Sequence, residues 1–378
     1  MKTLIKNGIV IIDGNKTIKN GGVLVEDDKI IGVYKNWENV KSDQQIDAQG
    51  NYIVPGLIET HTHGISGYDF NTCHSEDISK ISEALLDEGV TAFFASLVSE
   101  PHDVLLKLLD MYDKCTDKNF MGVHIEGPFL NTERTGVMKK EHMQLPNFEN
   151  FNEYLQHCSR VKSMTIAPEL PNAYDLITYA NNQGIVMNVG HSLATSQEVL
   201  QAQQYGAKGV THLYNAMNQH LHRDPGVVTG AFISDLFCEL IVDGYHVNYD
   251  IVLATYKLLG KERIVLICDA NPCKGLPDGE YRFSGNDVVI INGEARVKST
   301  RRIAGSTLKL NKACKNIMNL TNCSMNDAIY MASTHPAEIY GLNKGKLVPG
   351  YDGDVLVVNK DFDILAVVNQ GTIQRNKL

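Results

Sequence analysis

What the sequence lacks excludes several classes of protein. Its 378 residues include 8 cysteines but no Cys-x-x-Cys pair, so we expect no disulfide framework. Several cysteines, such as Cys238 and Cys268, lie in apolar runs and are expected to be small residues of the core. No apolar run reaches the roughly 18 residues of a transmembrane helix. An excess of positive charge is also missing. The net charge is −9 and the pI about 5.8, which argues against nucleic-acid and anionic-membrane partners.

The start of the chain lacks the pattern of a secretion signal. In MKTLIKNGIVIIDG, residues 1–14, the apolar stretch is short and lysine interrupts it, so we expect a cytoplasmic protein. Low-complexity tracts are missing too. With 43% hydrophobic and 21% charged residues, the chain is expected to be globular.

The two ends of the chain are rich in expected strands. Residues 3–54 and 345–374 alternate short apolar runs with Gly, Asp and Asn. Hairpin turns are expected at Asn7-Gly8, Asp13-Gly14 and Gly21-Gly22. We therefore expect one small β-sandwich domain built from both chain termini, residues 1–54 and 345–378, around a different domain at 55–344.

The middle of the chain repeats a strand-and-helix pattern. Eight apolar runs begin near residues 53, 90, 120, 163, 184, 209, 238 and 263, and most are separated by helical patterns. Capping boxes at Thr195-x-x-Glu198 and Ser324-x-x-Asp327 mark helix starts. This alternation predicts an α/β fold, a (β/α)8 TIM-like barrel, with two further helices after the eighth run.

Polar residues gather where these runs end. His61 and His63 are two residues apart, so they project from the same face of a strand. The other runs end near Glu126, His191, His212, His246 and Asp269. A single histidine at such a place is most often structural. Together, at the carboxyl ends of barrel strands, these residues are typical of a catalytic site for a divalent metal such as Zn²⁺ or Fe²⁺.

Longer motifs carry a family resemblance over nearly the whole chain. PGLIETHTHG, HIEGPF, VGHS, THLYNAM, DGYHV, CDA and AGST resemble the N-acetylglucosamine-6-phosphate deacetylases of the amidohydrolase superfamily. The resemblance implies one metal ion bound by Glu126, His191 and His212. A second ion, which only some members bind, is implied at His61 and His63.

The resemblance also implies the catalytic and substrate-binding residues. Asp269 is implied as the general acid/base, and His246 as the histidine that binds the sugar or the developing oxyanion. Asn215 and the backbone of Ala216 are implied in the phosphate pocket. Arg223 is similar to an arginine that reaches the phosphate from the neighbouring subunit, which implies a homodimer. The backbone of Ile303, Ala304, Gly305 and Ser306 is implied to line the sugar.

The chemistry of these residues agrees with amide hydrolysis. A metal activates water, and Asp269 can transfer its proton to the departing nitrogen. No Gly-x-Ser-x-Gly elbow offers a competing nucleophile. Three alternatives stay open: deacetylation of a related acetamido sugar phosphate such as N-acetylgalactosamine-6-phosphate, another amidohydrolase reaction, and a metal-stabilised binding protein. The fourth run, SMTIAPEL, lacks the lysine that bridges two metals in cyclic-amide hydrolases, and Asp269 argues against a purely structural metal.

One substrate-binding position departs from the family pattern. Two residues after Gly136, where the family has a histidine that contacts substrate, this chain has Met138. Methionine is no strong donor, and a lost hydrogen bond to substrate costs about 1–3 kcal/mol. Two explanations are open besides simple drift of the loop: His142 replaces the missing donor, or the preferred acetamido sugar has changed.

Overall fold

The computed structural model describes residues 1–378, and the chain divides into two compact units. The first comprises residues 1–59, 82–92 and 309–378, and the second residues 60–81 and 93–308. The domain boundaries expected from the sequence differ from these limits and stay a prediction.

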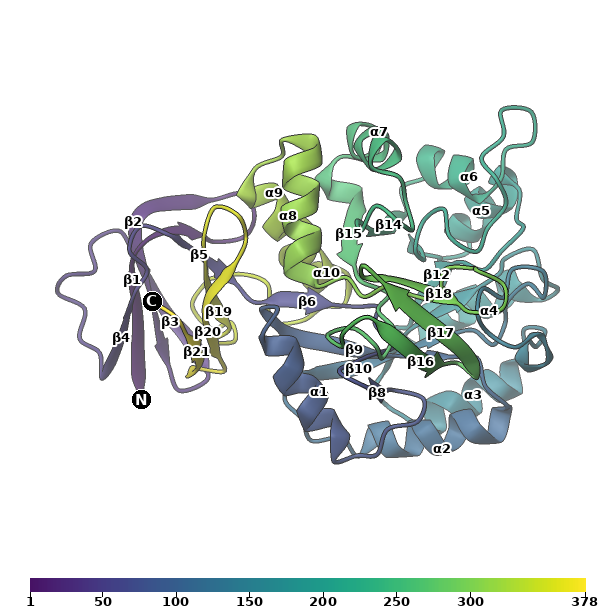
Figure 1. Cartoon of the computed structure of the whole chain (residues 1–378), viewed down its shortest axis with the longest axis horizontal. Coiled ribbons are helices and arrows are strands. Elements are labelled where there is room, and N and C mark those ends of the chain that lie inside the picture. Colours follow the sequence, from purple (N-terminus) through teal and green to yellow (C-terminus); the bar gives the residue numbers. More distant parts are fainter. The chain divides into compact units, whose positions relative to one another are not determined.

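The first unit contains an eight-stranded sheet to which both chain ends contribute (Figure 1). Its strands, in the order β21-β20-β19-β5-β1-β2-β3 with β4 on β1, are Thr372–Asn376, Ile364–Asn369, Val355–Val358, Tyr52–Pro55, Lys2–Ile11, Thr17–Glu26, Lys29–Tyr34 and Gln44–Asp47. Buried aliphatic residues of β1, β2, β5, β19 and β20 form its core. The expectation of a β-rich unit from both termini is confirmed.

Only one of the three expected turns is a hairpin turn. Asp13-Gly14 connects β1 to β2, and the Asp13 carboxylate accepts the backbone N–H of Asn15 at 3.1 Å. The other two predictions were wrong. Asn7 lies inside β1 with φ of 57°, where a shift of register makes a bulge, and Gly21 lies inside β2. A Cβ at Gly21 would lie 2.8 Å from a methyl group of Val10, so close strand packing requires this glycine.

Parallel strands form the predicted barrel, in the order β15-β14-β13-β12-β11-β10-β9-β6. From β6 to β15 they are Leu57–Glu59, Val90–Val98, Phe120–Glu126, Val161–Ile166, Val186–Val189, Gly209–Val210, Phe237–Ile241 and Ile264–Ile267. The segments after the first and last strands close the barrel: the N–H of Asp269 donates to the carbonyl of His61 at 2.8 Å, and that of His63 to the carbonyl of Ala270 at 2.8 Å.

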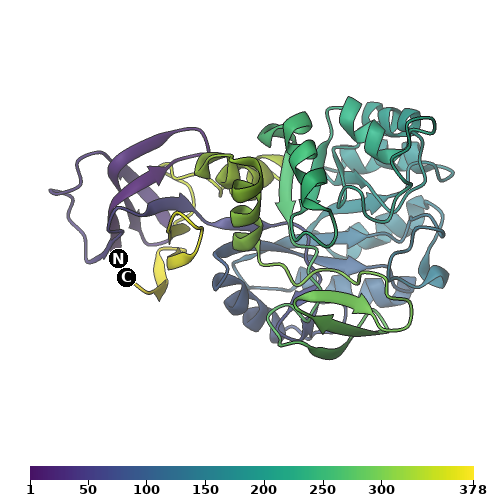
Figure 2. The ribbon, with the colours of Figure 1, turned by 45° about the horizontal axis from the view of Figure 1, so that its top comes forward.

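Helices α2 to α7 lie around the parallel strands of the second unit, and helices α8 to α10 belong to the first unit (Figures 1 and 2). The ten helices α1 to α10 span Asp77–Leu86, His102–Asp113, Phe148–His157, Ala173–Asn182, Ser196–Gln204, Val227–Ile233, Tyr249–Leu259, Leu310–Thr321, Met325–Ile329 and His335–Ile339. Both predicted capping boxes are present, at the starts of α5 and α9. None of the helices has the length and hydrophobicity that crossing a membrane requires.

A three-stranded antiparallel sheet follows β15 and was not expected from the sequence. Its strands β16, β17 and β18 span Gly279–Phe283, Asn286–Ile291 and Glu294–Val297. Turns at Ser284-Gly285 and Asn292-Gly293 carried a usable hairpin signal. The apolar face of this sheet packs on Val98, Leu130 and Met138, so it adds a wall beside the ends of the barrel strands.

Candidate metal centre

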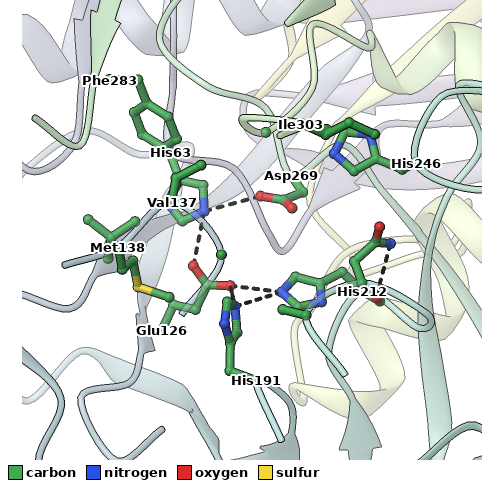
Figure 3. Close-up of a pocket in the computed structure, with 15 residues that line it drawn as sticks. His63, Glu126, Val137, Met138, His191, His212, His246, Asp269, Phe283 and Ile303 are labelled. Atoms are coloured by element: carbon green, nitrogen blue, oxygen red, sulfur yellow. Dashed lines mark hydrogen bonds and ion pairs between the residues drawn. The ribbon is translucent and has the colours of Figure 1, made fainter. Parts of the chain in front are cut away.

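The first ligand group consists of Glu126, His191 and His212. Glu126 ends β10, while His191 and His212 each lie two residues beyond the last residue of β12 and β13. Glu126 Oε1, His191 Nε2 and His212 Nε2 lie 3.0 Å from one another (Figure 3). All three residues are buried, so three strand ends bring three potential ligand atoms to one point.

The hydrogen bonds around this group fit a bound cation. His191 Nδ1 lies 2.6 Å from the carbonyl of Arg134, which can only accept, so the proton of a neutral ring is on Nδ1. Its Nε2 then directs a lone pair at the Glu126 carboxylate. A cation satisfies both atoms, and the His, His and Glu donor set suits Zn²⁺ or Fe²⁺.

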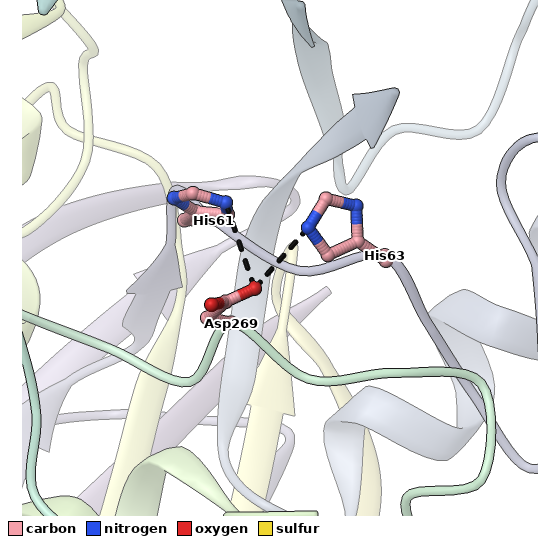
Figure 4. A group of neighbouring side chains, drawn as sticks. All are labelled: His61, His63 and Asp269. Atoms are coloured by element: carbon pink, nitrogen blue, oxygen red, sulfur yellow. Dashed lines mark ion pairs between the residues drawn. The ribbon is translucent and has the colours of Figure 1, made fainter. Parts of the chain in front are cut away.

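The second ligand group consists of His61, His63 and Asp269 (Figure 4). Asp269 Oδ1 lies 3.2 Å from His63 Nε2 and 3.7 Å from His61 Nε2. The opposite ring nitrogens are held in place, because His63 Nδ1 donates to the carbonyl of Ser96 at 3.0 Å and His61 Nδ1 to the carboxylate of Glu239 at 2.9 Å.

Glu126 faces both ligand groups. Its Oε1 contacts the first group, and its Oε2 lies 3.4 Å from His63 Nε2. Burial alone would raise the pKa of Glu126, but His191, His212 and His61 hold it well below its ordinary value. The carboxylate therefore stays ionised and faces both groups, because Oε1 also lies 3.5 Å from His61 Nε2.

Asp269 and His61 also have shifted pKa values. Burial would raise the pKa of Asp269, yet the nearby His61 and His63 rings lower it. Burial would lower the pKa of His61, yet the Glu239 and Asp269 carboxylates raise it well above its usual value. Strong mutual electrostatic attraction between buried ionisable groups is typical of functional clusters.

Backbone strain occurs at the ends of three barrel strands. His191, His212 and Asp269 have φ of 48°, 31° and 47°, a left-handed region that residues with a side chain rarely adopt. Such strain persists only where surrounding structure maintains it, and it is common at functional sites. In this chain it occurs at residues of both ligand groups.

A cavity of about 200 Å³ opens over the ligand groups. Besides His63, Glu126, His191, His212 and Asp269, it is lined by predicted substrate-binding residues: Met138, Asn215, Ala216, His246, Ile303 and Gly305. His61, Ala304 and Ser306 do not line it, although Ser306 donates its N–H to the carbonyl of Asp269 at 2.8 Å. Arg223 is exposed and lies outside the cavity of its own chain.

His246 is held by a carboxylate that the sequence analysis did not single out. Asp243 Oδ2 lies 2.7 Å from His246 Nδ1, and Asp243 Oδ1 accepts the backbone N–H of His246 at 2.8 Å. Burial would lower the pKa of His246, but Asp243 outweighs it and raises the pKa. The ring is therefore fixed with Nε2 as its remaining donor.

An apolar wall lines one side of the cavity. Val98, Val137 and Phe283 were not predicted, and they line the cavity together with Met138. Val137, Met138 and Phe283 are labelled in Figure 3. The Met138 sulfur accepts the backbone N–H of Ser99 at 3.3 Å. Phe283 could not be found from a motif, because it reaches the cavity through the unexpected sheet β16–β18.

His142 does not line the cavity beside this wall. Its Nδ1 donates to the carbonyl of Ser99 at 3.0 Å and lies 3.4 Å from the Glu100 carboxylate. The structure therefore gives no support to His142 as a replacement donor for substrate.

An α/β barrel with buried His, Glu and Asp groups at the carboxyl ends of its strands defines a class, the metal-dependent barrel hydrolases. The amidohydrolase family model matches residues 52–374. The chain belongs to the amidohydrolase family.

Relatives narrow the similarity within this family. The chain is 30% identical to N-acetylglucosamine-6-phosphate deacetylase of Lysinibacillus sphaericus, with 98% of each chain covered. It is 32% identical to N-acetylgalactosamine-6-phosphate deacetylase of Escherichia coli O157:H7, over 85% of this chain and 87% of the relative. A solved structure of the Mycobacterium smegmatis N-acetyl-D-glucosamine-6-phosphate deacetylase with N-acetyl-D-glucosamine-6-phosphate has a TM-score of 0.94 at 28% identity, covering 99% of this chain and 100% of that one.

Proposed function

We propose that this protein hydrolyses the acetamide of N-acetylglucosamine-6-phosphate to glucosamine-6-phosphate and acetate. The observation that carries this function is the first ligand group facing Asp269 across one cavity, in a chain that resembles such deacetylases over nearly its whole length. An electrophilic site and a carboxylate base together are what hydrolysis of an unactivated amide requires.

The metal is proposed to bind to Glu126, His191 and His212, with a second ion at His61, His63 and Asp269. Zn²⁺ or Fe²⁺ suits these donors. When bound, a divalent metal lowers the pKa of water and polarises a carbonyl. Glu126 would help to hold an ion at either group, because its carboxylate lies 3.0 Å from His191 Nε2 and 3.4 Å from His63 Nε2.

Asp269 is proposed as the general acid/base. Its lowered pKa keeps it a carboxylate, so it can accept a proton from the attacking water. It then returns that proton to the departing nitrogen, which leaves as an amine while the carbon retains the water oxygen as acetate. His246 Nε2 is proposed to donate to the carbonyl oxygen, since Asp243 engages Nδ1.

The phosphate is proposed to bind at Asn215 and the backbone of Ala216, completed by Arg223 of a second subunit. The exposed position of Arg223 outside its own cavity supports this arrangement. A largely apolar groove on the same unit supports the homodimer, and it is lined by Tyr214, His220, Phe232, Ile251, Ala254 and Leu258. Ile251 and Leu258 are 44% and 58% exposed, which favours their burial in an interface.

A related acetamido sugar phosphate is the second candidate substrate. Met138 places an apolar side chain in the cavity where a hydrogen-bond donor to substrate is expected. One of the relatives is named N-acetylgalactosamine-6-phosphate deacetylase. The backbone of residues 303–306, beside Asp269, is proposed to contact the sugar ring.

Elemental analysis combined with an acetate-release assay tests the proposal. Purified protein should contain a divalent transition metal and release acetate from N-acetylglucosamine-6-phosphate faster than from the unphosphorylated sugar. N-Acetylgalactosamine-6-phosphate serves as the competing substrate. Equal activity on both unphosphorylated and phosphorylated sugars, or no acetate release at all, would contradict the proposed function.

A further inference from the structure

A buried carboxylate lies behind the second ligand group. Glu239 is in the middle of β14, in the apolar run FCELI, and is 1% exposed. An ionised side chain is costly to bury unless it is paired. Its Oε2 lies 2.9 Å from His61 Nδ1 and 3.3 Å from the backbone N–H of His212. Both partners belong to residues of the candidate metal centre.

Glu239 determines which nitrogen of His61 faces the ligand group. Because a carboxylate accepts, the proton of a neutral His61 ring is on Nδ1, and Nε2 directs its lone pair toward Asp269 and Glu126 at 3.7 and 3.5 Å. The edge of the His124 ring, with centroids 4.5 Å apart, packs against the same ring. His61 therefore has one orientation.

The other histidines of the two groups have no such partner. The Nδ1 atoms of His63 and His191 donate to neutral carbonyls, those of Ser96 and Arg134. Of these histidines, only His61 has a ring nitrogen that donates to a carboxylate. Such a hydrogen bond makes the other ring nitrogen a stronger metal ligand. The negative charge of the carboxylate also offsets part of the positive charge that a second cation brings next to a first.

We propose that Glu239 is a positioning residue that enables the second ligand group to bind a metal ion. The inference rests on the metal-dependent hydrolysis proposed above. It goes further because it names a residue outside both ligand groups that decides whether one ion or two are held. Glu239 acts through His61 and touches neither substrate nor the cavity.

Metal titration of the chelator-treated full-length protein tests this role. Wild-type protein should bind two Co²⁺ ions per chain. Calorimetry and the visible spectrum of the ion measure the binding. Glu239→Gln keeps the side-chain shape and an acceptor oxygen but removes the charge. It should weaken the affinity of the second ligand group for its ion roughly 10- to 100-fold, the usual effect of losing a hydrogen-bond partner behind a metal ligand. The affinity of the first group should change by less than about threefold.

Two variants serve as controls. His61→Ala should lose the second ion in the same manner. Glu169→Gln removes a carboxylate near the first group, where it accepts from Ser192 Oγ at 2.7 Å and from the backbone N–H of Leu193 at 2.6 Å. It should leave the affinity for the second ion within about threefold of wild type, because Glu169 does not contact His61.

A second test uses wild-type protein alone, so it does not require any variant to fold. In wild-type protein loaded with two zinc ions, nitrogen-15 NMR should show His61 protonated on Nδ1 and coordinated through Nε2. The opposite tautomer would overturn the proposal. Three other results would also overturn it: binding of a single ion by wild-type protein, an unchanged affinity for the second ion in Glu239→Gln, or an equal loss of affinity for both ions in that variant.

Acetate release separates this inference from the proposed function. If wild-type protein binds two ions and Glu239→Gln loses the second, the inference holds even when no acetamido sugar phosphate is hydrolysed. If the sugar is hydrolysed but wild-type protein binds only one ion, the proposed function holds and the inference fails.

Discussion

The first and second ligand groups are assembled in different ways. In the first, β10 supplies Glu126 and the segments after β12 and β13 supply His191 and His212, and the three ligand atoms lie 3.0 Å from one another. In the second, one segment supplies both histidines, and Asp269 comes from the far end of the sheet. Asp269 Oδ1 lies 3.2 Å from His63 Nε2 and 3.7 Å from His61 Nε2. The second group exists only because the barrel closes.

This difference indicates a division of roles. A compact group whose three atoms already converge is suited to hold an ion that catalysis always needs. The looser group depends on barrel closure and on Glu239, and one of its members, Asp269, is proposed to transfer protons. We therefore expect damage to the first group to have the largest effect.

Replacing His191 with alanine should have the largest effect on activity. It removes one of three ligands from the first group, so that ion is lost and acetate release should fall by about 10⁴-fold or more. Elemental analysis and the rate of acetate release measure both effects. Full activity in metal-free protein would show that the first group is not a catalytic metal site.

Asp269→Asn should have the next largest effect. Asparagine keeps the shape but cannot accept a proton, so the turnover rate should fall roughly 10²- to 10⁴-fold. The ion of the first group should remain, as measured by elemental analysis, which separates the two groups. Weaker substrate binding with unchanged turnover would mean that the role is misassigned.

Arg223→Ala should affect neither ligand group. A charged hydrogen bond to phosphate contributes about 1.5–3 kcal/mol, so KM for a 6-phosphosugar should rise roughly 10- to 100-fold. An unphosphorylated sugar is the control and should show little change, with metal content as in wild type. Equal effects on both substrates would refute the phosphate contact.

Changes at the apolar wall should have the smallest effects. If the missing donor limits activity on N-acetylglucosamine-6-phosphate, Met138→His should raise kcat/KM by about tenfold or less, because a newly made hydrogen bond contributes a net of only about 0.5–1.5 kcal/mol. His142→Ala is the matched control and should change kcat/KM by less than about threefold, since His142 does not line the cavity and its Nδ1 is engaged by the carbonyl of Ser99. A loss of tenfold or more in His142→Ala would restore His142 as the substitute donor.

Local sequence patterns predicted much of this protein. Apolar runs of strand length ending in His, Glu or Asp indicated both the parallel strands and their catalytic ends. The boxes at Thr195 and Ser324 marked helix starts correctly, because capping involves residues only three positions apart. Hydrophobic periodicity and caps are short-range properties, and they can be seen without knowing the rest of the fold.

Features that depend on distant residues were decided by the tertiary structure alone. Asn7-Gly8 reads as a hairpin turn, yet strand pairing makes it a bulge inside β1. Glu239 reads as a polar interruption of a buried strand, yet barrel closure brings it 2.9 Å from His61, 178 positions away. Alternation along a strand shows which residues face inward. Which of them meet is decided by the register and closure of the sheet, and these are properties of the whole chain.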